Sequence, residues 1–314
     1  AHRLLPARPF HRGSPDATIC HPSLFTLYPS RPPALPRAAH SASERAAGPP
    51  SSSRLPGVFT SLMPFRSPLL TALVSVYQGE EFLDGCLRDL VEQTLFARGD
   101  LCIVVVDAHS PGRERQIVKS FRRDHPDQIL YRRLWRRRSL YHAWNLGIRM
   151  TSSPYLTSAN VDDRHRPDGL ERLVEVLEGD SDVDGVYADQ WITERPHETF
   201  ANNSAKERWG WPDYDPAILR RRCILGPQPV WRRSLHDRFG WFDASFASAG
   251  DWEFWLRCSA DARFLRIPEV LGLYYRNPRG LEAANPRAAA EDREVRRRHG
   301  LLREPPEPTV PVPL

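Results

Sequence analysis

The sequence predicts an α/β domain with a doubly wound, mostly parallel sheet, and three observations support this prediction. From residue 69 onward, apolar runs of strand length alternate with segments of helical periodicity. The run 101–106 is continuously apolar, which is typical of a strand buried on both faces of a parallel sheet. Acidic and amide residues follow several of these runs, where such folds bind their ligands. We expect a single domain over residues 66–300, followed by a flexible tail at 301–314.

The segment 1–65 differs in composition from the rest of the chain. Residues 1–62 hold eleven prolines among serines and arginines, without apolar periodicity. Such a segment cannot offset the entropy of ordering, so we predict that it is disordered. A transit peptide and an interaction tail are two interpretations. We favour a third, in which translation begins at Met63, because the chain opens at Ala1 and Met63 is its first methionine.

The net charge of +5 also belongs to this segment. Residues 1–62 carry seven arginines against Asp16 and Glu44, which accounts for the whole excess (7 − 2 = 5). The predicted domain is therefore balanced in charge. A nucleic-acid-binding domain should carry a positive excess of its own, so we expect no nucleic-acid partner.

The first elements read β-α-β-α-β. Residues 70–77 are β-branched and apolar, and the run breaks at Gln78 and Gly79. A helix follows, with acidic residues at its start and apolar residues at helical spacing over 82–91. The strand 101–106 ends at Asp107 and a loop at 108–112. A second helix around 117–121 and a strand at 129–134 complete this part.

The next elements continue the alternation and then become irregular. A helix contains Leu140, Trp144 and Ile148, a strand covers 155–159, a helix covers 170–177 and a strand covers 183–188. Residues 190–245 are rich in Trp, Pro, Arg and Asn and show weak periodicity. The last predicted elements are a helix at 252–258, short strands at 264–267 and 270–275, and a charged helix at 286–299.

The ends of three strands carry oxygen-bearing side chains. They are Asp107, the group Asn160, Asp162 and Asp163, and the pair Asp189 and Gln190. Strand ends at one edge of the sheet bring such groups together. The segment 77–81 has one glycine and two acids, so it is neither a dinucleotide fingerprint nor a P-loop.

Asp162 and Asp163 are hard oxygen donors that suit Mg²⁺ or Mn²⁺, and phosphate oxygens would complete the shell of the ion. The alternative is that these residues form a solvated turn. Their position directly after a predicted buried strand keeps both interpretations open.

Five motifs in order resemble the inverting family-2 glycosyltransferases of the GT-A fold. They are LTALVSVYQGEEFLDGCLRDLVEQT, IVVVDAHSPG, AWNLGI, SANVDDRH and AGDWEFWLR, and together they cover about residues 69–280. The resemblance implies a nucleotide site at Tyr77, Asp107, Asn145 and Asn160, in which Asp107 holds the base. It implies a divalent metal, Mg²⁺ or Mn²⁺, at Asp162 and Asp163, and a catalytic base at Asp251. The expected activity is transfer of a sugar from a nucleotide-diphosphate sugar, UDP-linked, with inversion.

Two positions depart from the pattern of that family. The first acid of its D-x-D motif is Asn160 here, so charge neutralisation of the metal rests on Asp162, helped by Asp163. The acid that usually precedes the catalytic aspartate is Gly250, so the base rests on Asp251, with Glu253 a poorer candidate. Asn160 could instead bond a ribose hydroxyl.

Further predictions concern the sites of the acceptor and the diphosphate. Trp209, Trp211 and Trp231, with the segment 226–229, could form an acceptor site or could be ordinary packing units. Within this region we favour Gln228 and Trp231, together with Asp189, as acceptor-site candidates. Most of the arginines at 132–138 should be solvated, with one or two pointing inward. His165 could be a third metal ligand, but a lone histidine beside arginines is more typical of a surface group, which we favour.

Two other interpretations of function remain. A sugar-nucleotide nucleotidyltransferase would need a glycine- and Arg/Lys-rich loop after the first strand, which 78–82 is not. A non-catalytic carbohydrate- or partner-binding protein on a degenerate fold would explain Asn160 and Gly250, but the retained aspartates speak against it. The expected partners are a nucleotide-sugar donor and a saccharide or a lipid- or protein-linked acceptor.

The five cysteines contain no C-x-x-C pair, and the longest apolar run is far too short to span a bilayer. We therefore expect a cytoplasmic protein without a transmembrane segment, and a peripheral position at the membrane stays open.

Overall fold

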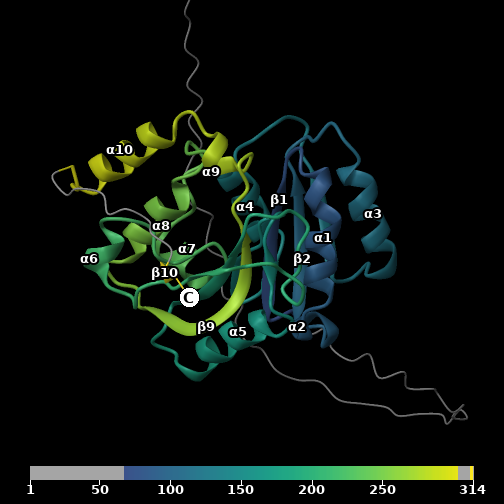
Figure 1. Cartoon of the computed structure of the whole chain (residues 1–314), viewed down its shortest axis with the longest axis horizontal. Helices are drawn as coiled ribbons and strands as arrows, with labels where there is room; N and C mark the ends of the chain where they lie inside the picture. The colour runs from purple at the N-terminus through teal and green to yellow at the C-terminus, as the bar shows by residue number, and fades with distance from the viewer. Residues whose placement is uncertain (1–66, 303–311, 314) are drawn as a thin grey trace, which may run out of the picture. The chain divides into compact units, whose positions relative to one another are not determined.

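The computed structural model describes residues 67–302 and 312–313, which fall within the second of two compact units, Met63–Leu314. The predictions for 1–65 and for most of the tail lie outside the described residues. The predicted α/β class is confirmed, since helices alternate with strands of one sheet (Figure 1). Among the described residues, no helix combines the length and the apolar character needed to cross a bilayer.

The elements up to the middle of the domain lie close to their predicted positions, except for the short α2 and β5, which were not predicted. They are β1 (Leu70–Val76), α1 (Glu80–Val91), α2 (Thr94–Ala97), β2 (Leu101–Asp107), α3 (Glu114–Asp124), β3 (Ile129–Arg133), α4 (Leu140–Arg149), β4 (Tyr155–Ser158), β5 (Arg164–His165), α5 (Gly169–Gly179) and β6 (Gly185–Thr193). The later elements are β7 (Glu207–Trp209), α6 (Pro216–Leu219), β8 (Val230–Arg232), α7 (Ser234–Phe239), α8 (Gly250–Cys258), β9 (Phe264–Tyr275), α9 (Leu281–Ala284), α10 (Ala288–Arg298) and β10 (Val312–Pro313).

The sheet is parallel in one half and mixed in the other. Its strand order over the described residues is β10-β7-β6-β8-β4-β1-β2-β3, and β9 pairs with both β6 and β5. Strands β3, β2, β1 and β4 are parallel neighbours, as the sequence predicts. Beyond them β8 lies antiparallel to both β4 and β6. The expectation of a mostly parallel sheet therefore holds for the first half, and the three-residue strand β8 reverses direction beyond it.

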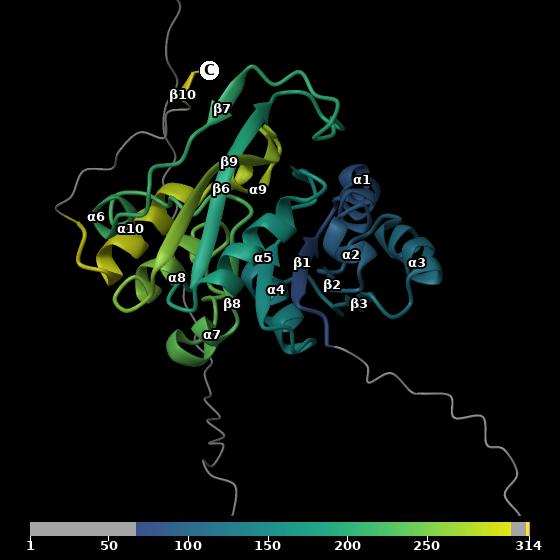
Figure 2. The ribbon, with the colours of Figure 1, turned by 90° about the horizontal axis from the view of Figure 1, so that it is seen from below.

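The sheet is covered on both faces, which explains the apolar strands. Leu70, Ala72 and Val74 of β1 pack into a core with α1, α3 and α5. Leu73, between them in the sequence, packs into the opposite core with α4 and α8. Successive residues of a strand point to opposite faces, so one strand serves both cores. In Figures 1 and 2, α1, α2 and α3 gather beside the β1–β3 half, and α6, α8 and α10 gather at the other end.

The two short strands expected at 264–267 and 270–275 are one strand, β9. Its pairing with β6 shifts register between Ala188 and Asp189, opposite Pro268 and Glu269. Proline has no N–H to donate to a neighbouring strand, so the extra residues bulge and the ladder resumes beyond them. Strand β9 therefore continues through Pro268, although a proline in a sequence usually predicts the end of a strand.

The contact between α4 and the sheet depends on a glycine. A Cβ atom at Gly147 would lie 2.9 Å from Cδ2 of Leu73 and 3.4 Å from Cγ1 of Val104. At Gly179, the last residue of α5, an added Cβ would meet nothing within 4 Å.

We therefore predict that Gly147→Leu lowers the free energy of unfolding by about 1–3 kcal/mol through overpacking. Gly179→Leu, the matched control, should change it by less than about 0.5 kcal/mol. Urea unfolding measures both. Equal effects of the two substitutions would contradict the close packing of α4 on β1.

Candidate functional site

A cleft of about 1610 Å³ opens beside the ends of β1 and β4. Its walls come from the loop after β1 (Tyr77–Gly79), the loop after β4 (Asn160–Asp163), the first turns of α4 and α8, and the region of α9 and α10. Strand ends of a parallel sheet and helix starts thus meet in one hollow, as the fold class predicts. The predicted site residues can be placed relative to this cleft.

Asp107 ends β2 and is 1% exposed. Its Oδ1 accepts the backbone N–H of Ser110 at 2.6 Å. Its Oδ2 accepts the hydroxyl of Tyr131 at 2.8 Å and Nε of Arg133 at 3.2 Å. Burial, and then the hydrogen bond to Asp107, raise the pKa of Tyr131 well above its usual range, so Tyr131 remains a donor. The carboxylate is therefore tightly held, and its contact with a nucleotide base stays a prediction.

Tyr77 lines the cleft next to this carboxylate loop. The guanidinium carbon of Arg137 lies 4.3 Å from the centre of its ring, in a cation–π contact. Gln78 and His109, in the two adjoining loops, have φ of 53° and 73°. Such left-handed conformations are uncommon outside glycine and recur at binding sites. Arg137 and Arg138 both line the cleft, and Arg133 donates from Nε to Asp107. The expectation that one or two of the arginines at 132–138 point inward toward the diphosphate stays a prediction.

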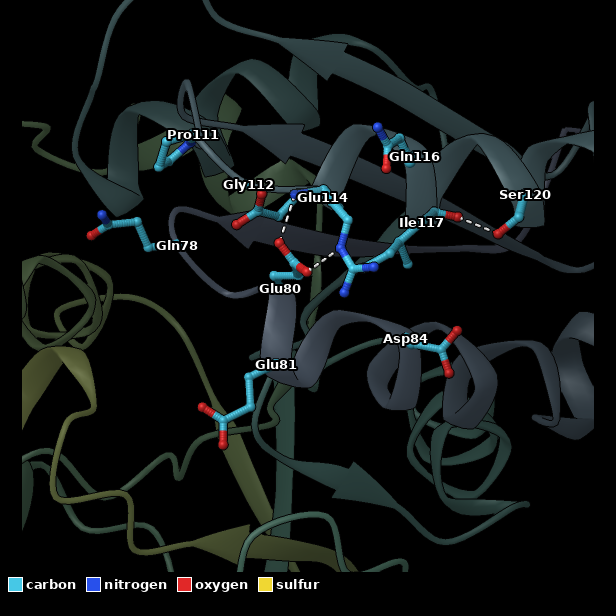
Figure 3. Close-up of a pocket in the computed structure, with 11 residues that line it drawn as sticks. Gln78, Glu80, Glu81, Asp84, Pro111, Gly112, Glu114, Gln116, Ile117 and Ser120 are labelled. Carbon is cyan, nitrogen blue, oxygen red and sulfur yellow. Dashed lines mark hydrogen bonds and ion pairs between the residues drawn. The ribbon is translucent and has the colours of Figure 1, made fainter.

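A second, shallower pocket of about 890 Å³ lies between the first turns of α1 and α3 (Figure 3). There Glu80 accepts the backbone N–H of Arg113 at 2.7 Å and its Nε at 2.5 Å. These bonds lower the pKa of Glu80. The pair joins the loop after β2 to the start of α1 and so helps to fix the position of Asp107.

The loop after β4 brings its two aspartates into different environments. Asp162 lines the cleft, and its Oδ2 accepts Nδ2 of Asn277 at 2.9 Å. Asp163 is 2% exposed; it accepts Nδ2 of Asn160 at 3.0 Å and the backbone N–H of Tyr275 at 3.3 Å. Burial, and then the charge of Asp162, raise the pKa of Asp163 well above its usual range. Both aspartates line the cleft, and the carboxylate of Asp163 in addition holds the loop to β9. A cation at either aspartate stays a prediction.

His165 was considered as a metal ligand or a surface group, and the structure speaks only to the second of these. It is buried, and its Nδ1 lies 2.7 Å from Oδ2 of Asp89 on α1. The expected surface position is therefore wrong. The pair with Asp89 holds Nδ1 inside the domain, and Nε2 is buried without a hydrogen-bond partner.

Asp251 lies in the first turn of α8 and lines the cleft. Its Oδ1 accepts the hydroxyl of Tyr141 at 3.0 Å and the backbone N–H of Trp252 at 2.8 Å. Glu253, the poorer candidate, is buried and paired with Arg257 at 2.9 Å. Of these two carboxylates, Asp251 is the one in position to meet a substrate.

Asn145 links α4 to the segment before α8. Its Nδ2 donates to the backbone oxygen of Phe242 at 2.7 Å, and its Oδ1 accepts the backbone N–H of the same residue at 3.1 Å. The side chain is buried. Both of its polar atoms thus serve the backbone, and a nucleotide contact by Asn145 stays a prediction.

The three acceptor-site candidates are all buried. Gln228 is 4% exposed and donates from Nε2 to the backbone oxygen of Arg164 at 3.0 Å. Trp231 donates from Nε1 to Nε2 of His236 at 3.1 Å, within a cluster of aromatic rings. Asp189 is 0% exposed and bonds the guanidinium groups of Arg208 and Arg266. Neither Gln228 nor Asp189 lines the cleft, so their acceptor roles stay predictions without support from their positions.

Other aromatic side chains are better exposed to the cleft. Trp209 is half-buried and stacks on Trp211, with ring centres 4.4 Å apart. The rings of Trp252 and Tyr274 also line the cleft. Trp209 and Trp211 were candidates from the sequence, whereas Tyr131, Tyr141 and Asn277 were not, because their partners are far away in the chain. No local pattern could have identified these three.

The position of Asp189 leads to a test. Because its carboxylate is buried among two guanidinium groups and the backbone N–H of Trp211, we expect Asp189→Ala to lower the free energy of unfolding by about 3–5 kcal/mol. Chemical denaturation measures the loss. Full stability together with a raised KM for the acceptor would instead support the predicted acceptor role.

The sequence of this chain is similar to those of known glycosyltransferases. The family described as "Glycosyl transferase family 2" matches residues 71–228. The "PGL/p-HBAD biosynthesis glycosyltransferase" of Mycobacterium bovis (strain BCG / Pasteur 1173P2) is 24% identical over 217 residues, covering 68% of this chain and 79% of that protein. An uncharacterized glycosyltransferase of Bacillus subtilis (strain 168), YwdF, is 28% identical over 134 residues, covering 42% and 48% of the two chains.

Solved structures share the fold. Residues 1–349 of TarS from S. aureus, in complex with UDP-GlcNAc, match with a TM-score of 0.58 and 15% identity over 72% of this chain and 65% of that one. The mannosyltransferase PcManGT of Pyrobaculum calidifontis, in complex with GDP-Man and Mn²⁺, matches with a TM-score of 0.56 and 20% identity over 77% and 66%. This chain thus spans slightly less than two thirds of each solved chain. The likeness shows the GT-A fold that the sequence predicts.

Proposed function

The chain belongs to glycosyltransferase family 2, and we propose that it transfers a sugar from a UDP-linked donor to an acceptor hydroxyl with inversion and metal assistance. Sugar transfer itself follows from the family and the named relatives. The observation that carries the finer proposal is that Asp162 and Asp251, from opposite halves of the domain, line the same cleft.

The proposed reaction is one displacement at the anomeric carbon. The oxygen of the acceptor hydroxyl forms a bond to that carbon, and the bond from the carbon to the diphosphate oxygen breaks with its electron pair. The carboxylate of Asp251 takes the proton of the hydroxyl as general base. Attack opposite the leaving group inverts the anomeric centre.

The residues at the end of β4 suit a divalent ion that is bound largely by the substrate. Among residues 67–302 and 312–313, no group of three or more His, Cys, Asp or Glu side chains could hold a metal. Mg²⁺ and Mn²⁺ need only one or two carboxylates when phosphates complete their shell. Asp162 would hold such an ion, and Asp163 is the predicted second ligand. When bound, the ion would neutralise charge on the departing diphosphate.

The donor would lie along the ends of β1, β2 and β4. Tyr77 offers a ring face at the cleft, and Asp107 follows in the next strand. Asn160 lines the cleft with its amide beside Asp163, where a ribose or phosphate oxygen could meet it. Arg137 and Arg138 add positive charge on the same wall. We therefore place the nucleoside near the end of β2 and the diphosphate near the loop after β4.

We expect calorimetric titration to detect UDP binding that requires Mn²⁺ and is abolished by EDTA. Asp162→Ala should weaken binding at least tenfold, because the ion loses its exposed carboxylate. Asp127→Ala, an exposed aspartate outside the cleft, is the matched control and should bind as the unmodified chain does. Tight binding of GDP in place of UDP would reassign the base. Binding that persists unchanged in EDTA would contradict the metal.

We also expect Asp251→Asn to lower kcat by about 10²–10⁴, the usual contribution of a general base. The affinity for UDP should stay within about twofold, since the base does not contact the nucleotide in this proposal. Asp261→Asn, beyond the other end of α8, should leave kcat unchanged. An Asp251→Asn protein with full turnover would exclude Asp251 as the base, and UDP binding without turnover in the unmodified protein would favour a binding protein.

A further inference from the structure

We propose that Tyr141 is the positioning residue for Asp251, and that it takes the place left by the missing acid at residue 250. The inference rests on the proposed function, because Asp251 is the base there. It concerns a residue that neither the sequence motifs nor the reaction scheme include.

The first support is a hydrogen bond between two helix starts. The hydroxyl of Tyr141, in the first turn of α4, donates to Oδ1 of Asp251, in the first turn of α8, at 3.0 Å. The two residues are 110 positions apart in the chain. The same oxygen accepts the backbone N–H of Trp252 at 2.8 Å. Two donors therefore converge on one carboxylate oxygen and restrict the rotation of the side chain.

The second support is the rigid setting of the tyrosine ring. Tyr141 is 1% exposed, although its helix borders the cleft. Its ring meets the ring of Trp144 edge-on at 5.4 Å and lies 5.9 Å from that of Phe242. Phe242 is itself held by the two hydrogen bonds of Asn145. Because the ring is fixed by its neighbours, its hydroxyl can hold the carboxylate of Asp251 in one orientation.

The third support is Gly250. A Cβ atom at this position would lie 2.7 Å from both Cδ2 and Cε2 of Tyr141 and 3.0 Å from Cζ. Carbon atoms never approach that closely, so any side chain at 250 would push the ring away. The tyrosine ring therefore occupies the space that a side chain at residue 250 would need. For this reason an acid before Asp251 and the ring of Tyr141 in its present position exclude each other.

The protonation state of the tyrosine fits this role. Burial, and then the neighbouring charge of Asp251, raise the pKa of Tyr141 well above its usual range. The hydroxyl therefore keeps its proton and acts as a donor at neutral pH. It does not compete with Asp251 for the proton of the acceptor.

The test compares two tyrosines. Tyr141→Phe removes only the hydroxyl, and we expect kcat to fall roughly 10- to 100-fold, the usual effect of removing a hydrogen bond to a charged group. The KM for the donor and the affinity for UDP should stay within twofold. Tyr187→Phe is the matched control, because Tyr187 is also buried and its hydroxyl donates to the backbone oxygen of Pro212 at 2.8 Å. It should retain the kcat of the unmodified protein.

A double-mutant cycle separates this inference from the proposed function. In the Asp251→Asn background, Tyr141→Phe should have no further effect on the residual kcat, because the base that it positions is gone. Gly250→Ala should lower kcat as Tyr141→Phe does, and it should do so much less when Tyr141 is already Phe. Independent, multiplying effects in the cycle, or a Tyr141→Phe enzyme with unchanged kcat, would overturn the inference. Full turnover of Asp251→Asn would overturn the proposed function first.

Discussion

The parallel pairing of β1 with β2 and with β4 is the constraint on which the proposed donor side of the cleft depends. In this pairing Val76 lies opposite Asp107, and Leu73 lies opposite Ser158. Three neighbouring strands therefore run in one direction and reach the same edge of the sheet. The loop with Tyr77, the loop after Asp107 and the loop with Asn160 and Asp162 leave from that edge as adjacent segments. Their proximity needs no specific contact between side chains, because hydrogen bonds between backbones determine it.

The side of the cleft that carries Asp251 depends on side-chain packing and not on strand pairing. Asp251 comes from a helix start and not from a strand end, and α8 belongs to the layer that covers the opposite half of the sheet. Its place relative to the donor loops depends on side chains: the bonds of Asn145 to Phe242, the ring of Tyr141 and the aromatic core around Trp255. A small repacking in that core would move Asp251 without disturbing the strand ends.

The same division explains how much could be predicted from the sequence. Strands β1, β2, β3 and β4 were predicted within two residues at each end. For β1 and β2 the reason is that buried parallel strands are nearly continuous apolar runs. The elements β7, α6, β8 and α7 were not, because they have three to six residues each and lie among tryptophans and prolines. Asp107, Asp162 and Asp251 could be selected by motif. For Asn145, Gln228 and Asp189 the sequence could not show the bonds that they make inside the domain, because a polar side chain that bonds the interior looks the same in a sequence as one that binds a ligand.

The pair of bonds between Asn145 and Phe242 limits what evolution can place at this position. A side-chain amide presents a donor and an acceptor in one plane, as a peptide group does, and here it pairs with a peptide group. Aspartate has almost the same shape but only acceptors, and it would set a negative charge against the oxygen of Phe242. Aspartate, the residue nearest to asparagine in size, should therefore be among the most destabilising substitutions at position 145. A change of the side-chain amide at residue 145 to a carboxylate would weaken the contact between α4 and the segment before α8, although no residue that lines the cleft had changed.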